Sequence, residues 1–172
     1  MVFGVVMQYK AKALDRDTGD LARELEPVVL GLGFALVELS LYRSGRKKTG
    51  KNNAQIRLIV TGKPEAGLPG DKTPGIGTDE LSRIHRAVLP RLELALEGAD
   101  LHVEVSSPGT DRLVKEGAEF CHYTGRAIKC WRKDKWEQGI LRSSDEEKIT
   151  LETAGGMQEM KYETIAKARL DG

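Results

Sequence analysis

The chain contains little cysteine, few aromatic residues and no long hydrophobic run. Its 172 residues include two cysteines, Cys121 and Cys130, with no second pair to complete a disulfide framework or a four-ligand zinc site. No stretch of about 18 apolar residues is present. Residues 1–13 lack the charged start and the apolar centre of a secretory signal. We therefore expect a cytoplasmic protein without membrane association, whose two thiols stay reduced.

The chain also lacks an excess of charge of either sign. Its 27 lysines and arginines face 26 aspartates and glutamates, and a net charge of +1 excludes a strongly basic, histone-like protein. The distribution is uneven, because residues 42–63 carry seven basic side chains and no acidic one, which would draw a polyanion to the first half of the chain. These seven are Arg43, Arg46, Lys47, Lys48, Lys51, Arg57 and Lys63.

The first half of the chain mixes helical and strand patterns. Apolar residues recur every three or four positions in 21–32 and 81–96, which predicts two helices. Pro27 and Pro90 fall inside them, and we expect each proline to kink its helix or divide it in two. Residues 63–77, rich in glycine and proline, are expected to be a loop. Three strands, at 34–41, 54–61 and 101–106, complete an α-β-β-α-β order.

The second half has short strand patterns separated by tight turns, which predicts a small barrel. The strands are expected at 126–131, 136–142, 148–153, 158–161 and 167–170. Because the two halves differ in pattern and no internal repeat is present, we expect two different domains, an α+β domain over 1–112 and an all-β barrel over 113–172.

The most distinctive segment, 103–112, reads Val-Glu-Val-Ser-Ser-Pro-Gly-Thr-Asp-Arg. A residue before proline prefers extended angles, proline fixes its own φ and glycine permits positive φ, so 107–110 fits a type II turn. The residues beyond it stand where the chain passes from the first domain to the second. We interpret the segment as an interdomain elbow rather than a ligand site, formed by Ser106, Ser107, Pro108, Gly109, Asp111 and Arg112.

This segment closely resembles the signature of the ribosome maturation factor RimP family, Glu-Val-Ser-Ser-Pro-Gly followed by Asp-Arg. The resemblance extends to Gly31-Leu32-Gly33 before the first strand, to the helix start at 78–84, to Gly125 and to the ending at 165–170. The chain departs from the family at Leu113-Val114, where Pro-Leu is usual, and its loop at 63–77 is longer than typical.

The resemblance implies a KH-like α/β domain followed by an Sm- or SH3-like barrel. It implies a protein that binds the small (30S) ribosomal subunit or its precursor, through 16S rRNA and a small-subunit ribosomal protein, and that assists late maturation. It also implies no catalytic reaction and no cofactor. We expect the protein to be a monomer.

Basic residues in and beside the first hairpin are candidate rRNA contacts, because lysine and arginine near phosphates release counterions and supply sequence-independent affinity. The alternative is a solvated loop, which would be favoured in an arbitrary protein. The family resemblance reverses that preference. The glycines at 45 and 50 lack the spacing of the KH nucleotide-gripping loop, so that contact is not predicted. The candidates are Arg43, Arg46, Lys47, Lys48, Lys51 and Arg57.

Two tryptophans bracket residues 132–135, a predicted four-residue hairpin loop that would place the indoles opposite each other. Two interpretations stay open. The rings either cover one end of the barrel, or they form a docking surface for rRNA or a ribosomal protein, since tryptophan beside basic residues suits both. The candidate docking residues are Trp131, Arg132, Lys133 and Trp136.

An enzyme is disfavoured, because Ser106 and Ser107 do not lie in a Gly-x-Ser-x-Gly elbow and no phosphate-binding glycine loop is present. His85 lies on the apolar face of the second helix and is interpreted as a core histidine. The main alternative function is an RNA-binding regulator that acts on small or messenger RNA through the same two folds.

Overall fold

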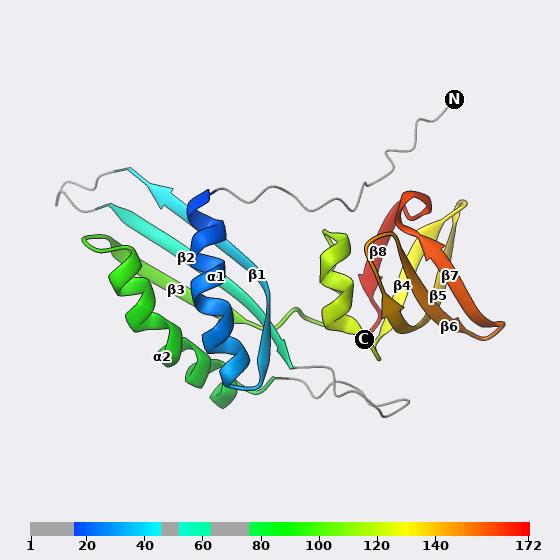
Figure 1. The fold of residues 1–172 in the computed structure, drawn as a ribbon, viewed down its shortest axis with the longest axis horizontal. Coiled ribbons are helices and arrows are strands. Elements are labelled where there is room, and N and C mark those ends of the chain that lie inside the picture. Colours follow the sequence, from blue (N-terminus) through cyan, green and yellow to red (C-terminus); the bar gives the residue numbers. More distant parts are fainter. Residues whose placement is uncertain (1–15, 46–51, 63–75) are drawn as a thin grey trace. The chain divides into compact units, whose positions relative to one another are not determined.

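The computed structural model describes residues 16–45, 52–62 and 76–172. Within this part of the chain, 16–45, 52–62 and 76–108 form one compact unit and 109–172 form another (Figure 1). We call them the N-terminal unit and the C-terminal unit. The domain boundary between residues 112 and 113 stays a prediction.

The N-terminal unit has the predicted α-β-β-α-β order. Strands β1 and β2 pair antiparallel, and β2 pairs parallel with β3, so β2 is central in a mixed sheet of order β1-β2-β3. The elements are α1 (Arg16–Gly31), β1 (Phe34–Ser44), β2 (Asn53–Gly62), α2 (Thr78–Ala95) and β3 (Asp100–Ser106).

The core of this unit lies between the two helices and one face of the sheet. Three residues of α2 at four-residue spacing, Ile84, Val88 and Leu92, are fully buried, as expected for one apolar stripe. Alternate residues of β2, such as Ile56 and Leu58, meet this stripe. The spacing of apolar residues in α2 and β2 therefore matches the face that each element buries.

Both interior prolines lie within continuous helices, so of the two predicted alternatives, a kink or a division into shorter pieces, the division is wrong. Helix α1 contains Pro27 and α2 contains Pro90, and both prolines are exposed. A proline leaves the carbonyl four residues earlier without its helical donor. On an exposed side that carbonyl can bond to water, so the helix continues.

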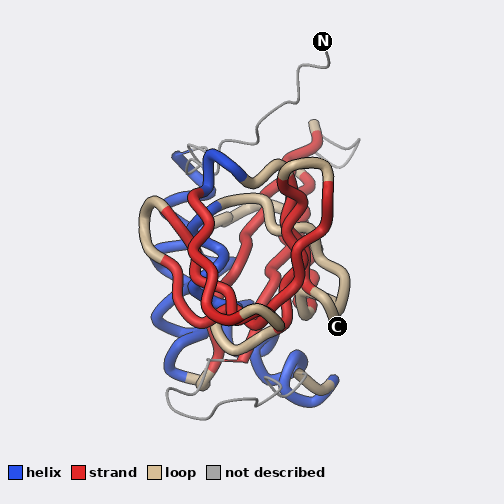
Figure 2. The backbone as a smooth tube through the Cα atoms, turned by 90° about the vertical axis from the view of Figure 1, so that its right-hand side faces the viewer, coloured by secondary structure: helices blue, strands red, loops and turns tan. Residues whose placement is uncertain are grey.

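The C-terminal unit is an antiparallel sheet of five strands in the order β7-β6-β5-β4-β8, and all five strand predictions are confirmed. Figure 2 draws the strands in red. A short 3₁₀ helix, η1, precedes the strands and was not predicted. The elements are η1 (Gly117–Tyr123), β4 (Ala127–Arg132), β5 (Lys135–Ser144), β6 (Lys148–Thr153), β7 (Gly156–Lys161), η2 (Tyr162–Thr164) and β8 (Lys167–Leu170).

The core of the C-terminal unit combines inward strand residues with aromatic side chains. Phe120 from η1 is fully buried and stacks on Tyr162, with ring centroids 5.7 Å apart. Ile128 and Cys130 share the buried face of β4, as predicted. Burial and the nearby charge of Glu137 raise the pKa of Cys130 to about 12, which keeps it in the thiol form.

One glycine of this sheet is required by close packing. A Cβ added at Gly139 would lie 2.6 Å from the backbone carbonyl oxygen of Glu152 on the neighbouring strand β6. A side chain at this position would therefore push the two strands apart. No described helix is long and apolar enough to cross a membrane.

Candidate functional site

The outer face of strands β8, β4 and β5 gathers aromatic and basic side chains. Because side chains alternate between the two faces of a strand, the residues next to the buried ones on each strand point outward together. Register places Trp131 opposite both Trp136 and Lys167, and Lys129 opposite both Gln138 and Arg169. We call this surface the tryptophan face, formed by Lys129, Trp131, Trp136, Gln138, Lys167 and Arg169.

The two indoles pack edge to face, as the sequence predicts for residues opposite each other. Their ring centroids lie 5.4 Å apart at an interplanar angle of 64°. The connecting loop has two residues rather than the predicted four, because Arg132 pairs with Lys135 across the ladder. Lys133 and Asp134 have φ values of 48° and 58°, the left-handed conformation that a type I′ turn requires.

A third member, Arg169, was not among the predicted site residues. Its guanidinium carbon lies 4.9 Å from the centre of the Trp136 ring, within cation–π range. The same guanidinium forms an ion pair with Asp111, whose Oδ1 lies 3.3 Å from Nη1 of Arg169. Trp136 remains 41% exposed. The face therefore presents an indole with one side supported by a cation and part of its surface open.

Arg132 and Lys133, the other two predicted docking residues, are not on the tryptophan face. Arg132 follows Trp131 on the strand, and its Nη2 lies 2.8 Å from Oε2 of Glu137, with both side chains largely buried. Burial alone would raise the pKa of Glu137, but the hydrogen bonds from Arg132 and Lys135 outweigh it and hold this pKa below its ordinary value. Lys133 is exposed in the turn.

The predicted elbow spans the junction of the two compact units. Ser106 ends β3, and Ser107 and Pro108 are the last residues of the N-terminal unit. Gly109 has a φ of +76°, the positive value that the predicted turn requires.

Arg112, at the far end of the elbow, is anchored inside the C-terminal unit. Its Nε and Nη2 each lie 3.1 Å from Oε2 of Glu119, and the two side chains are 8% and 7% exposed. Glu119 also accepts hydrogen bonds from the Lys115 amide at 3.2 Å and from the Tyr123 hydroxyl at 3.3 Å. Burial, with the Glu119 charge, raises the pKa of Tyr123 well above its ordinary value. We call these four residues the Arg112–Glu119 cluster.

Both residues of the motif's Asp-Arg pair have structural contacts in the C-terminal unit. Arg112 fastens the start of the C-terminal unit to η1, while Asp111 orients the cation beneath Trp136. Glu119 was missed by sequence reasoning, because a single acid in a 3₁₀ helix has no periodic signal. Its pairing with Arg112 becomes visible only when η1 folds back on the preceding segment.

Only two of the six candidate rRNA contacts are among the described residues, and both are ion-paired. Arg43 Nη1 lies 2.9 Å from Oδ2 of Asp17, and Arg57 Nε lies 3.4 Å from Oε1 of Glu104. Ser40 is opposite Arg57, and Arg43 is three positions further along β1, so the two arginines emerge on opposite faces of the sheet. The other four, which we call the basic loop, lie outside the described residues: Arg46, Lys47, Lys48 and Lys51.

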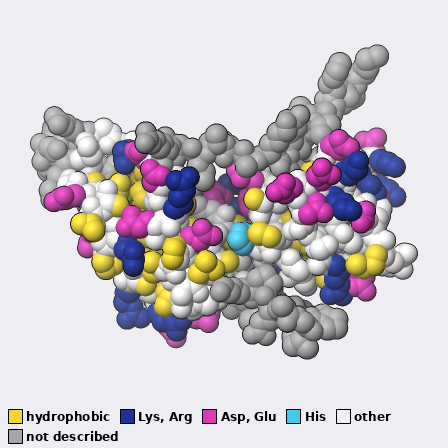
Figure 3. Space-filling model, viewed as in Figure 1, with side chains coloured by type: hydrophobic (Ala, Val, Ile, Leu, Met, Phe, Trp, Pro, Cys, Tyr) yellow, Lys and Arg dark blue, Asp and Glu magenta, His cyan; other side chains and the backbone are white. Residues whose placement is uncertain are grey.

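The visible surface has a mixed charge. On the side of the molecule that Figure 3 presents, lysine and arginine side chains of the described residues are interspersed with aspartate and glutamate. They do not gather there into one basic patch. The charge on this side alone therefore does not mark a site.

Comparisons with known proteins reveal distant relatives over most of the chain, although no family model matches it. A protein from Borrelia garinii subsp. bavariensis is 27% identical over 139 residues, which cover 81% of this chain and 85% of the relative. A protein from Borrelia hermsii is 25% identical over 154 residues, 90% and 96% of the two chains. A protein from Borreliella burgdorferi is 26% identical over 139 residues, 81% and 85%. Each is named Ribosome maturation factor RimP.

Proposed function

This chain is a distant homologue of the RimP proteins, as its Ser-Ser-Pro-Gly motif indicated, and on that premise we propose that it is a ribosome maturation factor. It binds the small ribosomal subunit or its precursor in the cytoplasm and promotes maturation without catalysing a reaction. The observation that carries this proposal is the homology, at 25–27% identity over 81–90% of the chain, to proteins of that name.

We assign the docking of a small-subunit component to the tryptophan face. Trp136 is 41% exposed and supported by Arg169, and a partly open, rigid indole is a common anchor in protein and RNA interfaces. Lys167 is opposite Trp131 and supplies positive charge beside the ring pair, whereas Lys129 is ion-paired with Asp171. The basic loop contributes attraction to rRNA phosphates, which needs no fixed geometry.

Sedimentation of the full chain with purified ribosomal particles tests this function. The protein is expected to travel with free small subunits and their precursors, and not with mature 70S ribosomes. Deletion of the gene is expected to leave cells viable, with free subunits in excess and unprocessed small-subunit rRNA accumulating. Normal subunit profiles and rRNA ends in the deletion strain, at low and ordinary growth temperature, would contradict the proposal.

The alternative function, a regulator of small or messenger RNA, gives a different result in the same experiment. Such a protein would sediment with ribosome-free RNA, and treatment with ribonuclease would move it to the top of the gradient. Binding to the small subunit that survives the removal of free RNA therefore separates the two functions.

A further inference from the structure

Strand β3 forms one edge of the N-terminal sheet. Among the described residues it pairs with β2 alone. The amide of Asp100 donates to the Asn52 carbonyl at 2.8 Å, so Asp100 and then every second residue direct their backbone groups toward β2. The N–H and C=O groups of the residues between them, Leu101 and Val103, consequently point away from the sheet. These are the groups that a further strand would bond.

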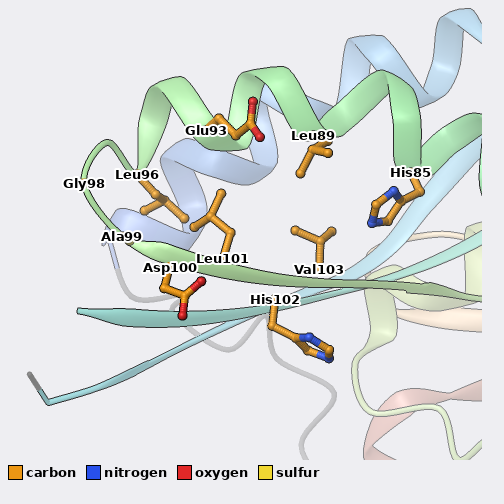
Figure 4. Close-up of a pocket in the computed structure, with 10 residues that line it drawn as sticks. All are labelled: His85, Leu89, Glu93, Leu96, Gly98, Ala99, Asp100, Leu101, His102 and Val103. Atoms are coloured by element: carbon orange, nitrogen blue, oxygen red, sulfur yellow. The ribbon is translucent and has the colours of Figure 1, made fainter. Parts of the chain in front are cut away.

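A cavity of about 550 Å³ runs beside this edge, between β3 and α2 (Figure 4). Leu89 on α2 and Leu101 and Val103 on β3 give it an apolar floor, with side chains that point toward one another in Figure 4. His85 also lines the cavity and is half-buried, rather than the core histidine that the sequence predicted. The edge therefore has space beside it for the side chains of an added strand.

The charge around this groove is negative at the end where α2 turns into β3. Glu93 and Asp100 line the cavity, and the exposed Glu97 lies in the turn that joins α2 to β3. Carboxylates at this position repel the phosphates of a nucleic acid and attract lysine or arginine. The groove is thus matched in charge to a cationic peptide.

We propose that the groove between α2 and β3 binds an extended, lysine- or arginine-rich segment of a partner protein, which adds as a fourth strand beside β3. Backbone groups of Leu101 and Val103 bond the segment, and every second side chain of the segment is apolar and enters the cavity on the α2 side. Basic residues at the end of the segment, beyond the paired strand, face Glu93 and Glu97. Strand addition of this kind takes affinity from the main chain and specificity from the pockets. This surface is separate from the tryptophan face.

The first test measures binding of a fluorescein-labelled ten-residue peptide to the full chain, by anisotropy at low salt. Its six central residues alternate valine and threonine, and two lysines stand at each end. Amide hydrogen exchange, followed by NMR, locates the contact. The amides of Leu101 and Val103 are expected to gain protection on binding, whereas that of His102, already directed toward β2, should change little. A peptide with N-methylated valines, which cannot pair as a strand, should lose the binding.

Charge-reversal variants separate the groove from general attraction. The double variant Glu93→Lys/Glu97→Lys is expected to weaken the peptide about tenfold, a change of about 1.4 kcal/mol. The matched control Glu24→Lys/Glu26→Lys changes the net charge equally on the exposed side of α1 and should bind as the parent does.

Three outcomes would overturn the proposal. The first is peptide binding that leaves the exchange of Leu101 and Val103 unchanged. The second is equal weakening by the two double variants. The third is protection of the same amides by a ten-nucleotide uridine RNA but not by the peptide, which would make the groove a nucleic-acid site.

Discussion

Removal of Arg112 is expected to destabilise the C-terminal unit strongly. In Arg112→Ala, Glu119 would remain buried at 7% exposure without its cation. Breaking a buried pair in this way costs about 3–5 kcal/mol. Glu119 would keep its hydrogen bonds from the Lys115 amide and the Tyr123 hydroxyl, so we expect the lower end of that range, about 3 kcal/mol. The total free energy of unfolding of a small domain is about 5–15 kcal/mol.

Tryptophan fluorescence during urea or thermal unfolding of the full chain measures this effect selectively. The chain has two tryptophans, and both lie in the C-terminal unit, so their emission follows that unit. For a unit of this size, about 3 kcal/mol corresponds to a decrease in melting temperature of about 12 °C or more.

Two further variants test whether the buried charge of Glu119 causes the loss of stability in Arg112→Ala. Glu159→Ala breaks an exposed pair with Lys148 in the same unit, with the Glu159 and Lys148 side chains 64% and 37% exposed, and should change the melting temperature little. The double variant Arg112→Met/Glu119→Leu removes both buried charges and should recover much of the lost stability. An Arg112→Ala variant that melts at the same temperature as Glu159→Ala, or a double variant that is no more stable than Arg112→Ala, would refute the reasoning.

The other predictions concern the elbow, the two binding surfaces and acid stability. Gly109→Val should cost more than about 1 kcal/mol, because a β-branched residue is strained at a φ of +76°, and a melting curve equal to the parent's would show that the turn tolerates it. Replacing the whole basic loop by alanine should weaken subunit binding at low salt and flatten its salt dependence, whereas unchanged affinity and slope would make it a solvated loop. Trp136→Ala should weaken subunit binding with little change in salt slope, while Met157→Ala, exposed on β7, should have no effect; equal effects of the two would argue against the tryptophan face. The folded-state pKa of Glu137 lies below its ordinary 4.5. The stabilisation that the Glu137 carboxylate gives to the folded unit is therefore present above pH 4.5 and is lost as the pH falls through the folded-state pKa. Glu137→Gln should thus lose less stability than the parent in acid, and parallel losses in urea melts would contradict this.

The elements that the sequence predicts are those in which apolar residues recur at a regular spacing. The sheet strands and both long helices have apolar residues at the spacing that their buried sides require. Helix η1 is too short to show such a period. The turn at Lys133 and Asp134 was predicted too long because neither residue is a glycine or asparagine, the usual signal for a two-residue connection.

The candidate site was predictable where its residues are close in sequence. Trp131 and Trp136 face each other because one hairpin joins them. Arg169 reaches the same place through the pairing of β8 with β4, which no local pattern reveals. Arg43 and Arg57 are near in sequence and share one charge, but strand alternation separates them onto opposite faces. Sequence proximity therefore predicts a hairpin contact better than a surface patch.

The strand order of the C-terminal unit also implies an order of assembly. Strands β4, β5, β6 and β7 follow one another as hairpins, and isolated hairpins form within about 1–10 μs. Strand β8 must instead return to β4, and Arg169 arrives beside Trp136 from thirty-three positions later in the chain. Closing so long a loop has a larger entropic cost than closing a hairpin. We therefore expect the contact between the two indoles to form early in folding and the contact of Arg169 with Trp136 to form later, which would leave Trp136 exposed for a time without its supporting arginine.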